Sequence, residues 1–356
     1  MITLNGKEYT RRELEQHVGH ISQIAGVRMM ELQDGPEAGV RIAEIRSGSG
    51  LRFQVTLDRG MDISVADYKG TALAWRSPNG DVHPSFYDPK GLGWLKSFPG
   101  GLVTGCGLTQ AGAPGVDDGE ELGLHGRLSH TPATHVETKT EWEEDTCTFK
   151  ISGTIRENTL FNQNLTLHRT IEVELGSSVF TLRDTVINDG FRPTPLMLLY
   201  HINVGWPLLD DGAALMLNAE TMTPRDPEAT KGVESATKIP SPIQGYKEQV
   251  FYHDLLPDWS GFATALLANK RLHLGLYVDY RQKELPKFTE WKMVGEGEYV
   301  LGMEPANCLV QGRAKERERG TLKILDPGEK REFLVRIGIL DGEAALDQFI
   351  QEKNLR

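Results

Sequence analysis

Residues 165–175 read LTLHRTIEVEL, a run in which apolar and polar side chains take turns. The apolar members are Leu165, Leu167, Ile171 and Val173, and the polar ones between them are Thr166, His168, Thr170 and Glu172. A period of two is typical of a β-strand with one face in the core and one face in water. A second alternating stretch, 179–188, follows Gly176-Ser177-Ser178, so the two stretches predict a β-hairpin.

The same strand signals recur along the chain, at residues 52–57, 148–156, 195–204, 262–268, 272–279, 299–304 and 332–340. No crossover helices separate these stretches, as a parallel sheet would require. The chain is therefore expected to be mainly β, in an antiparallel sandwich.

Two short helices are predicted, one near each end of the chain. Thr10-Arg11-Arg12-Glu13 fits a capping box and predicts a helix over about 10–17. Residues 344–350 place Leu346, Phe349 and Ile350 at helical spacing, which predicts a helix over about 343–353 packed on the sheets.

Length and composition indicate an ordinary globular protein. The 356 residues are 39% hydrophobic and 25% charged, without a Pro- or Ser-rich linker, so a single domain spanning 1–356 is expected. A net charge of −11 argues against a nucleic-acid partner. No apolar stretch approaches the length of a membrane span, and the N-terminus carries no leader pattern, so a cytoplasmic protein is expected. Cys106, Cys147 and Cys308 form no CxxC and are interpreted as buried thiols.

Two polar segments are interpreted from composition alone. Residues 111–121 are rich in Gly and acidic side chains and precede a histidine, so they could form one rim of a pocket or an ordinary surface connection. Residues 313–319 read RAKERER, with bases and acids interleaved, and are predicted to be a solvated loop or hairpin.

Three widely spaced motifs each place one ionisable side chain on a predicted strand or tight turn. They are Leu124-His125-Gly126-Arg127, Tyr200-His201-Ile202-Asn203 and Gly302-Met303-Glu304-Pro305. Two histidines and a carboxylate can move protons on and off oxygen near neutral pH. Histidines as metal ligands are disfavoured, because HxH, HExxH and CxxC patterns are absent and His125, His130 and His135 would alternate faces. Neither a metal nor another cofactor is expected.

The order of these motifs resembles that of the aldose 1-epimerase (galactose mutarotase-like) superfamily, and the resemblance covers nearly the whole chain. Further matching stretches are Val18–Arg28, Asp58–Ile63, Gly93–Leu102 and Leu285–Trp291, which look like a bacterial branch whose members mostly lack an assigned function. The resemblance implies a large two-sheet supersandwich with a cleft on one sheet. It also implies a small-molecule carbohydrate as the partner.

What the resemblance implies for the site can be stated residue by residue. His201 would be the general acid on the ring oxygen, Glu304 the base on the anomeric hydroxyl, and His125 a sugar-binding residue that orients the reacting oxygen. Candidate substrate contacts are Arg59, Arg127, Asn203, Lys287 and Trp291. Arg59 can fork hydrogen bonds onto hydroxyls, and the indole of Trp291 can pack on a sugar ring.

The expected activity is exchange of the α and β anomers of a free sugar or sugar derivative by acid–base ring opening, without a cofactor. Two alternatives stay open: a sugar-binding or regulatory module without turnover, and another sugar isomerase, epimerase or lyase that uses the same cleft. The chain also departs from the galactose mutarotases. An Arg-rich segment is replaced by residues 100–107, and Asp279 is only a positional guess for the substrate-binding Asp.

Overall fold

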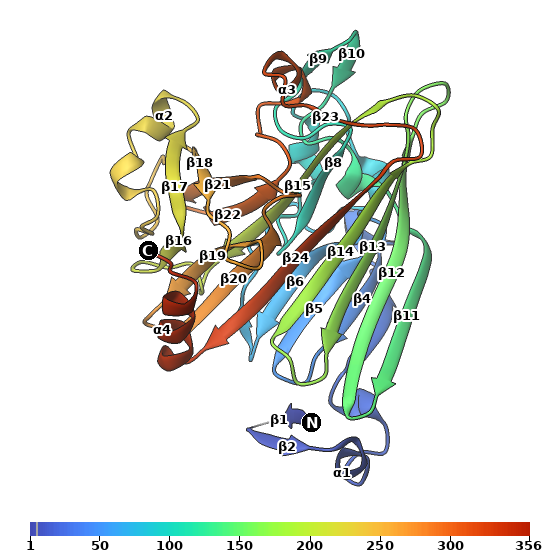
Figure 1. Cartoon of the computed structure of the whole chain (residues 1–356), viewed down its shortest axis with the longest axis vertical. Helices are drawn as coiled ribbons and strands as arrows, with labels where there is room; N and C mark the ends of the chain where they lie inside the picture. The colour runs from blue at the N-terminus through green and yellow to red at the C-terminus, as the bar shows by residue number, and fades with distance from the viewer. Residues whose placement is uncertain (5) are drawn as a thin grey trace.

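The structure is a computed structural model that describes residues 1–4 and 6–356, and most of its regular elements are β-strands (Figure 1). All ladders between named strands within this part of the chain are antiparallel, as the alternating stretches predict. The mainly β architecture expected from the sequence is confirmed.

An eight-stranded sheet forms one layer of the sandwich. Its strands, in spatial order, are β11 (Thr134–Glu143), β12 (Thr146–Asn158), β13 (Asn164–Glu174), β14 (Val179–Asn188), β24 (Lys330–Asp341), β20 (Leu274–Arg281), β19 (Phe262–Asn269) and β16 (Ala214–Leu217). The predicted hairpin is β13–β14, in which Leu167 pairs with Val186. Alternate residues of β13 are buried, so the period of two in the sequence is the period of burial.

A seven-stranded sheet and a five-stranded sheet lie against this layer. The seven-stranded sheet has β17 (Ala219–Pro224), β18 (Gln249–Leu255), β21 (Lys287–Gly295), β22 (Glu298–Ala306), β15 (Thr194–Gly205) and β23 (Lys323–Leu325) in spatial order, and β8 (Thr104–Leu108) also pairs with β15. The five-stranded sheet has β3 (Gly26–Glu31), β4 (Arg41–Arg46), β5 (Leu51–Thr56), β6 (Asp62–Tyr68) and β7 (Thr71–Ala72). Isolated bridges, Ile63 with Val103 and Ala74 with Val204, join the two sheets.

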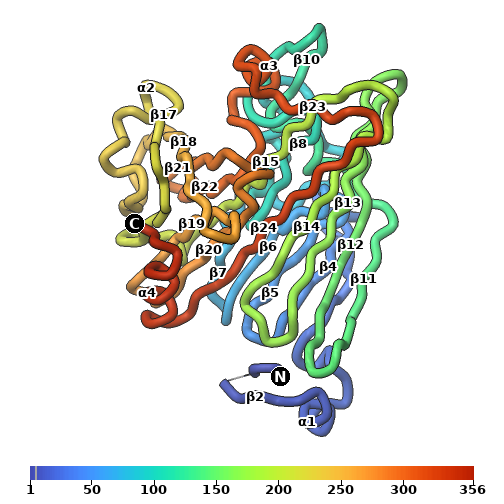
Figure 2. Tube along the Cα trace, in the orientation of Figure 1, coloured from blue at the N-terminus to red at the C-terminus, as the bar shows by residue number. Residues whose placement is uncertain are grey.

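Short elements cover the ends of the sandwich. They are the hairpins β1 (Ile2–Leu4) with β2 (Lys7–Tyr9) and β9 (Gly115–Asp117) with β10 (Glu120–Leu122), and the helices α1 (Arg11–Glu15), α2 (Pro227–Thr230), α3 (Arg313–Glu318) and α4 (Glu343–Glu352). Thr10 and Glu13 form the predicted capping box of α1. The chain trace in Figure 2 carries α4 back onto the edge of the eight-stranded sheet, where Leu346 packs against Leu266, as the helical spacing predicts. Each helix in the described part of the chain is too short or too polar to cross a lipid bilayer.

The basic run at 313–319 is not the loop or hairpin predicted for it. It forms α3, and both Arg313 and Glu316 are buried. The Arg313 guanidinium donates to Asp117 at 2.7 Å and to Glu120, both on the β9–β10 hairpin, and Arg317 donates to the same Asp117. The partners lie far away in the sequence, so the local charge pattern could not indicate that this run is ordered.

The three large sheets share one hydrophobic core. Phe53 of β5 stacks on Phe180 of β14 with ring centroids 4.5 Å apart, across the gap between the five-stranded and eight-stranded sheets. The three cysteines are free and buried, as expected. Burial of this much apolar surface is the main stabilising contribution to the fold.

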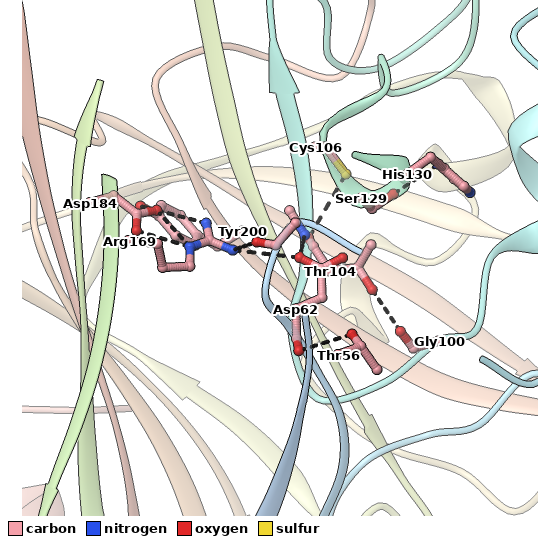
Figure 3. Close-up of polar contacts among 12 residues, drawn as sticks. Thr56, Asp62, Gly100, Thr104, Cys106, Ser129, His130, Arg169, Asp184 and Tyr200 are labelled. Atoms are coloured by element: carbon pink, nitrogen blue, oxygen red, sulfur yellow. Dashed lines mark hydrogen bonds and ion pairs between the residues drawn. The ribbon is translucent and has the colours of Figure 1, made fainter. Parts of the chain in front are cut away.

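A buried polar cluster sits inside this core and joins all three sheets (Figure 3). The Arg169 guanidinium of β13 donates hydrogen bonds from Nε and Nη2 to the two carboxylate oxygens of Asp184 on β14. The Tyr200 hydroxyl of β15 donates to the same carboxylate at 2.7 Å. Asp62 of β6 lies 3.5 Å from Arg169 and accepts a hydrogen bond from the Gly105 amide. Burial raises the pKa of Asp62 to about 7, although Arg169 opposes the shift.

Candidate active site

Strand β15 divides its side chains between the core and the opposite face of the seven-stranded sheet. Leu198, Tyr200 and Ile202 belong to the main core, whereas Leu199 packs in a separate cluster on the other side, the side of His201. The sequence predicted this division. His201 is therefore not a core residue, even though its strand is almost wholly apolar.

One row of side chains crosses the sheet on the His201 face. Tyr252 of β18 pairs with Thr289 of β21, and Thr289 pairs with Glu304 of β22. The register of β22 with β15, in which Met303 faces Ile202, brings Glu304 opposite His201. Paired residues project from the same face, so these four side chains form one polar row.

His201 and Glu304 form a close buried pair. Nε2 of His201 lies 3.2 Å from Oε1 of Glu304, and the two residues are 5% and 2% exposed. Gly302 makes room for this arrangement, because a Cβ at that position would lie 2.5 Å from Oε1 of Glu304. The glycine that precedes the carboxylate in the motif thus lets the Glu304 side chain turn toward the histidine.

Burial shifts the two pKa values in opposite directions. It lowers the pKa of His201 to about 4, because the protonated ring is poorly solvated, and it raises the pKa of Glu304 well above its ordinary value. Burial thus disfavours the charged form of each group, so a neutral carboxyl beside a neutral imidazole is favoured over an ion pair. The ordinary pKa values suggest the opposite distribution, with an ionised carboxylate and a protonated imidazole.

His125 approaches the pair from a tight turn. It adopts a positive φ of 56° and is followed by Gly126 with a φ of 71°, in agreement with the turn predicted from the flanking glycines. The Gly112 amide donates to Nδ1 at 3.3 Å. Burial lowers the pKa of His125 to about 3, so the ring is neutral and Nε2 carries its proton. Its ring centroid lies 5.6 Å from that of His201.

These groups line a cavity of about 420 Å³, within the size range of small-molecule sites. The lining residues are Leu92, Trp94, Leu95, Phe98, Ala113, Pro114, Leu124, His125, His201, Arg225, Glu248, Val250, Thr289, Trp291, Glu304 and Val310. The ring centroids of Phe98 and Trp291 lie 5.4 and 5.2 Å from that of His201. The ring centroid of Trp94 lies 4.7 Å from that of His125. Aromatic walls of this kind pack well on the apolar faces of a sugar ring.

Several buried polar atoms on this face have no hydrogen-bond partner among the described residues. They are Nδ1 of His201, Oε1 of Glu304, Oγ1 of Thr289, the hydroxyl of Tyr252 and Oδ1 of Asn203. An unsatisfied buried polar group costs about 1–3 kcal/mol, so most buried polar atoms in folded proteins are paired. Three of these atoms, on His201, Glu304 and Thr289, belong to residues that line the cavity, where a bound ligand can supply the missing partners.

The structure brings together His125, His201, Glu304 and Trp291 in the cavity, as the sequence predicted. It does not bring the other candidate contacts there. Asn203 is fully buried on the same face and donates to Gly101 and His201 carbonyls. Lys287 lies 3.8 Å from Asp254, outside the cavity lining.

The two candidate arginines also lie outside the cavity lining. Arg59 is fully buried and donates to the Val82 and Ser97 carbonyls, next to His130. It therefore supports the segment that carries Phe98 rather than facing the cavity. Arg127 donates to the Asn158 carbonyl and to Thr159.

Asp279, the positional guess for a substrate-binding carboxylate, lies on the eight-stranded sheet, where it accepts from Thr264 and faces Arg336. The carboxylate that lines the cavity beside Glu304 is Glu248, which the sequence did not point to. Thr289 was also missed, although it lies between Lys287 and Trp291 on the same face of β21 and alternation could have found it.

The remaining missed residues come from irregular segments. Glu248 and Arg225 form an ion pair at 2.9 Å, and the indole Nε1 of Trp291 donates to the other Glu248 oxygen. Within the described residues, no three metal-binding side chains converge.

The chain matches the family described as "Domain of unknown function (DUF4432)" over residues 37–339. It belongs to this family. No curated protein matches this DUF4432 chain. Among solved structures, it is similar to a putative aldose 1-epimerase from Klebsiella pneumoniae, with 27% identity, a TM-score of 0.88, and coverage of 92% of this chain and 86% of that one.

More distant structures place the DUF4432 chain in the same fold group. A galactose 1-epimerase from Lactobacillus acidophilus is 15% identical, with a TM-score of 0.58 and coverage of 90% of this chain and 100% of that one. A galactose mutarotase-like protein from Clostridium acetobutylicum is 12% identical, with a TM-score of 0.64 and coverage of 90% of this chain and 99% of that one. At these identities the two likenesses concern the fold alone. The aldose 1-epimerase-like resemblance inferred from the sequence is confirmed.

Proposed function

We propose that this protein is a sugar mutarotase, an isomerase that interconverts the α and β anomers of a free sugar. The observation that carries the proposal is the 3.2 Å approach of His201 and Glu304 inside an aromatic-walled cavity. Ring opening needs one group that accepts a proton from the anomeric hydroxyl and one that gives a proton to the ring oxygen. A carboxylate that accepts a proton and a protonated imidazole that gives one supply both roles.

The proton count of the pair fits this chemistry. Glu304 takes the proton from the anomeric hydroxyl, the bond between the anomeric carbon and the ring oxygen breaks, and His201 gives its proton to that oxygen. Rotation about the bond between the first two carbons and the reverse transfers give the other anomer. The pair begins with one proton and ends with one. The short separation lets the proton pass from the Glu304 carboxyl to His201 before the ring opens.

His125 orients the substrate in this proposal. Its Nδ1 accepts the Gly112 amide, so Nε2–H is free to donate to a sugar oxygen. The neutral ring adds no charge beside His201. Trp291 and Trp94 pack against the apolar face of the ring, and Thr289 offers a hydroxyl group that can donate or accept.

The direct test follows anomer exchange by NMR across a panel of pentoses, hexoses, deoxy sugars, sugar phosphates and acidic sugars. The proposal expects exchange of at least one sugar to be far faster with enzyme than without it. General acid and base groups each contribute roughly 10²–10⁴ in rate. A panel without any accelerated exchange would contradict the proposal, and so would the appearance of new constitutional products in place of anomers.

A further inference from the structure

The charged side chains that line the cavity neutralise one another. Arg225 is the only Lys or Arg among the described lining residues. Its guanidinium donates to Glu248 at 2.9 Å and to Asp226 at 2.8 Å. Glu248 in turn accepts the indole proton of Trp291 at 2.9 Å. Two carboxylates thus surround one guanidinium at the edge of the cavity.

Apart from Arg225, the described residues that line the cavity include no Lys or Arg. Burial keeps His125 and His201 neutral, with pKa values of about 3 and about 4. Burial also favours the neutral form of Glu304, because it raises the pKa of this carboxyl well above its ordinary value. The hydroxyl group of Thr289 is uncharged. The guanidinium of Arg225 is thus outnumbered by its own carboxylate partners, Glu248 in the cavity lining and Asp226 beside it.

We propose that Glu248 excludes anionic sugars from the cavity, so that the substrate is an uncharged sugar and not a sugar phosphate or sugar acid. An anionic group entering the cavity would leave water, and a buried charge without a partner is unfavourable. Arg225, the only Lys or Arg in the described lining, already has two carboxylate partners. Like charges placed close together across an interface disfavour binding and so act as a specificity device.

The inference rests on the proposed function for the identity of the cavity as a sugar site, but its test does not need turnover. Binding is measured by calorimetry at low ionic strength for matched probes: galactose with galacturonate, glucose with glucuronate, and glucose 6-phosphate. The neutral probes are expected to bind at least about tenfold more tightly than their anionic counterparts.

The Glu248→Gln variant tests the residue itself. The amide oxygen can still accept the Trp291 indole proton, but Arg225 loses one of its two carboxylates and can pair with an incoming anion. The ratio of neutral to anionic affinity is expected to fall by about tenfold, and added salt should reduce the effect. The matched control is Glu143→Gln, which removes the same charge from an exposed position on β11 and should leave the ratio unchanged.

Four outcomes would overturn the inference. They are equal or tighter binding of the anionic probes by the wild type, an unchanged ratio in Glu248→Gln, the same change in Glu143→Gln, and no binding of any neutral probe. Preferential binding of neutral sugars without any anomer exchange would instead contradict the proposed function alone and leave the charge selectivity standing.

Discussion

Nε2 of His201 and Oε1 of Glu304 approach to 3.2 Å from neighbouring strands, and burial moves their pKa values in opposite directions. A buried histidine is common in a β-sheet core, whereas a fully buried glutamate is rare. Here the two lie side by side in one cavity, and burial favours the neutral form of each. Groups with strongly perturbed pKa values that face each other in a cleft are typical of catalytic sites.

Replacing Glu304 with Gln is expected to abolish anomer exchange and to leave sugar affinity nearly unchanged. The amide can still form hydrogen bonds but cannot accept a proton at neutral pH. His201→Asn should behave in the same way. NMR exchange rates on the best sugar are expected to fall by roughly 10² or more in each variant. The matched control is Glu298→Gln, at an exposed position on the same strand as Glu304, which should keep the wild-type rate. Wild-type exchange in Glu304→Gln would show that the proton-transfer assignment is wrong.

The pH–rate profile is expected to be a broad bell. The active pair holds one proton in total, so the rate falls on the acid side when His201 takes up a second proton, near its pKa of about 4. On the alkaline side the rate falls as the pair loses its proton, at the raised pKa of Glu304. The apparent pKa values of the two limbs describe the coupled pair and not either residue alone. An acid limb near 6.5, the ordinary value for histidine, would contradict the effect of burial on His201.

Thr289→Val is expected to weaken sugar binding, and both Thr289→Val and Tyr252→Phe are expected to leave the fold equally stable or more stable. Each change removes a buried hydroxyl without a partner among the described residues, which relieves a cost of about 1–3 kcal/mol in the free protein. Calorimetric affinity and thermal unfolding give the two readouts. Thr140→Val, at an exposed position on β11, should change neither affinity nor stability. Lower stability together with unchanged affinity would assign the hydroxyls a structural role.

Asp62→Asn is expected to raise stability relative to the wild type as the pH increases. The folded pKa of Asp62, about 7, is above its ordinary 3.8, so the folded state binds this proton more tightly than the unfolded state does. The wild type therefore loses stability as the pH rises from about 4 to about 7, whereas the amide does not titrate. Denaturant unfolding of both proteins at several pH values measures the difference. Asp347→Asn, exposed on α4, is the control, and a difference independent of pH would show that Asp62 does not titrate in this range.

The fold could be predicted from the sequence because apolar and polar side chains alternate along strands such as β13 with the same period as burial. The sequence also pointed to His125, His201 and Glu304, which the fold brings to one cavity. Each of these residues lies in a short motif on one strand or turn. The sequence could not predict the partners of α3, since these ion pairs join segments that are remote in sequence. Arg59 was misplaced for a related reason, because its carbonyl partners at Val82 and Ser97 leave no signature in side-chain types.

On strand β15, the side chain that anchors the strand in the core and the side chain that faces the cavity belong to different residues. The Tyr200 hydroxyl donates a hydrogen bond to Asp184 of the Arg169–Asp184 pair in the core, and the next residue, His201, faces the cavity. Positions that face the cavity can therefore be varied in a mutant library without touching the anchor. A selection for new sugars that randomises the exposed lining residues Leu92 and Leu95 and preserves Tyr200 should recover many folded variants, so the substrate range of this scaffold can diverge faster than its architecture.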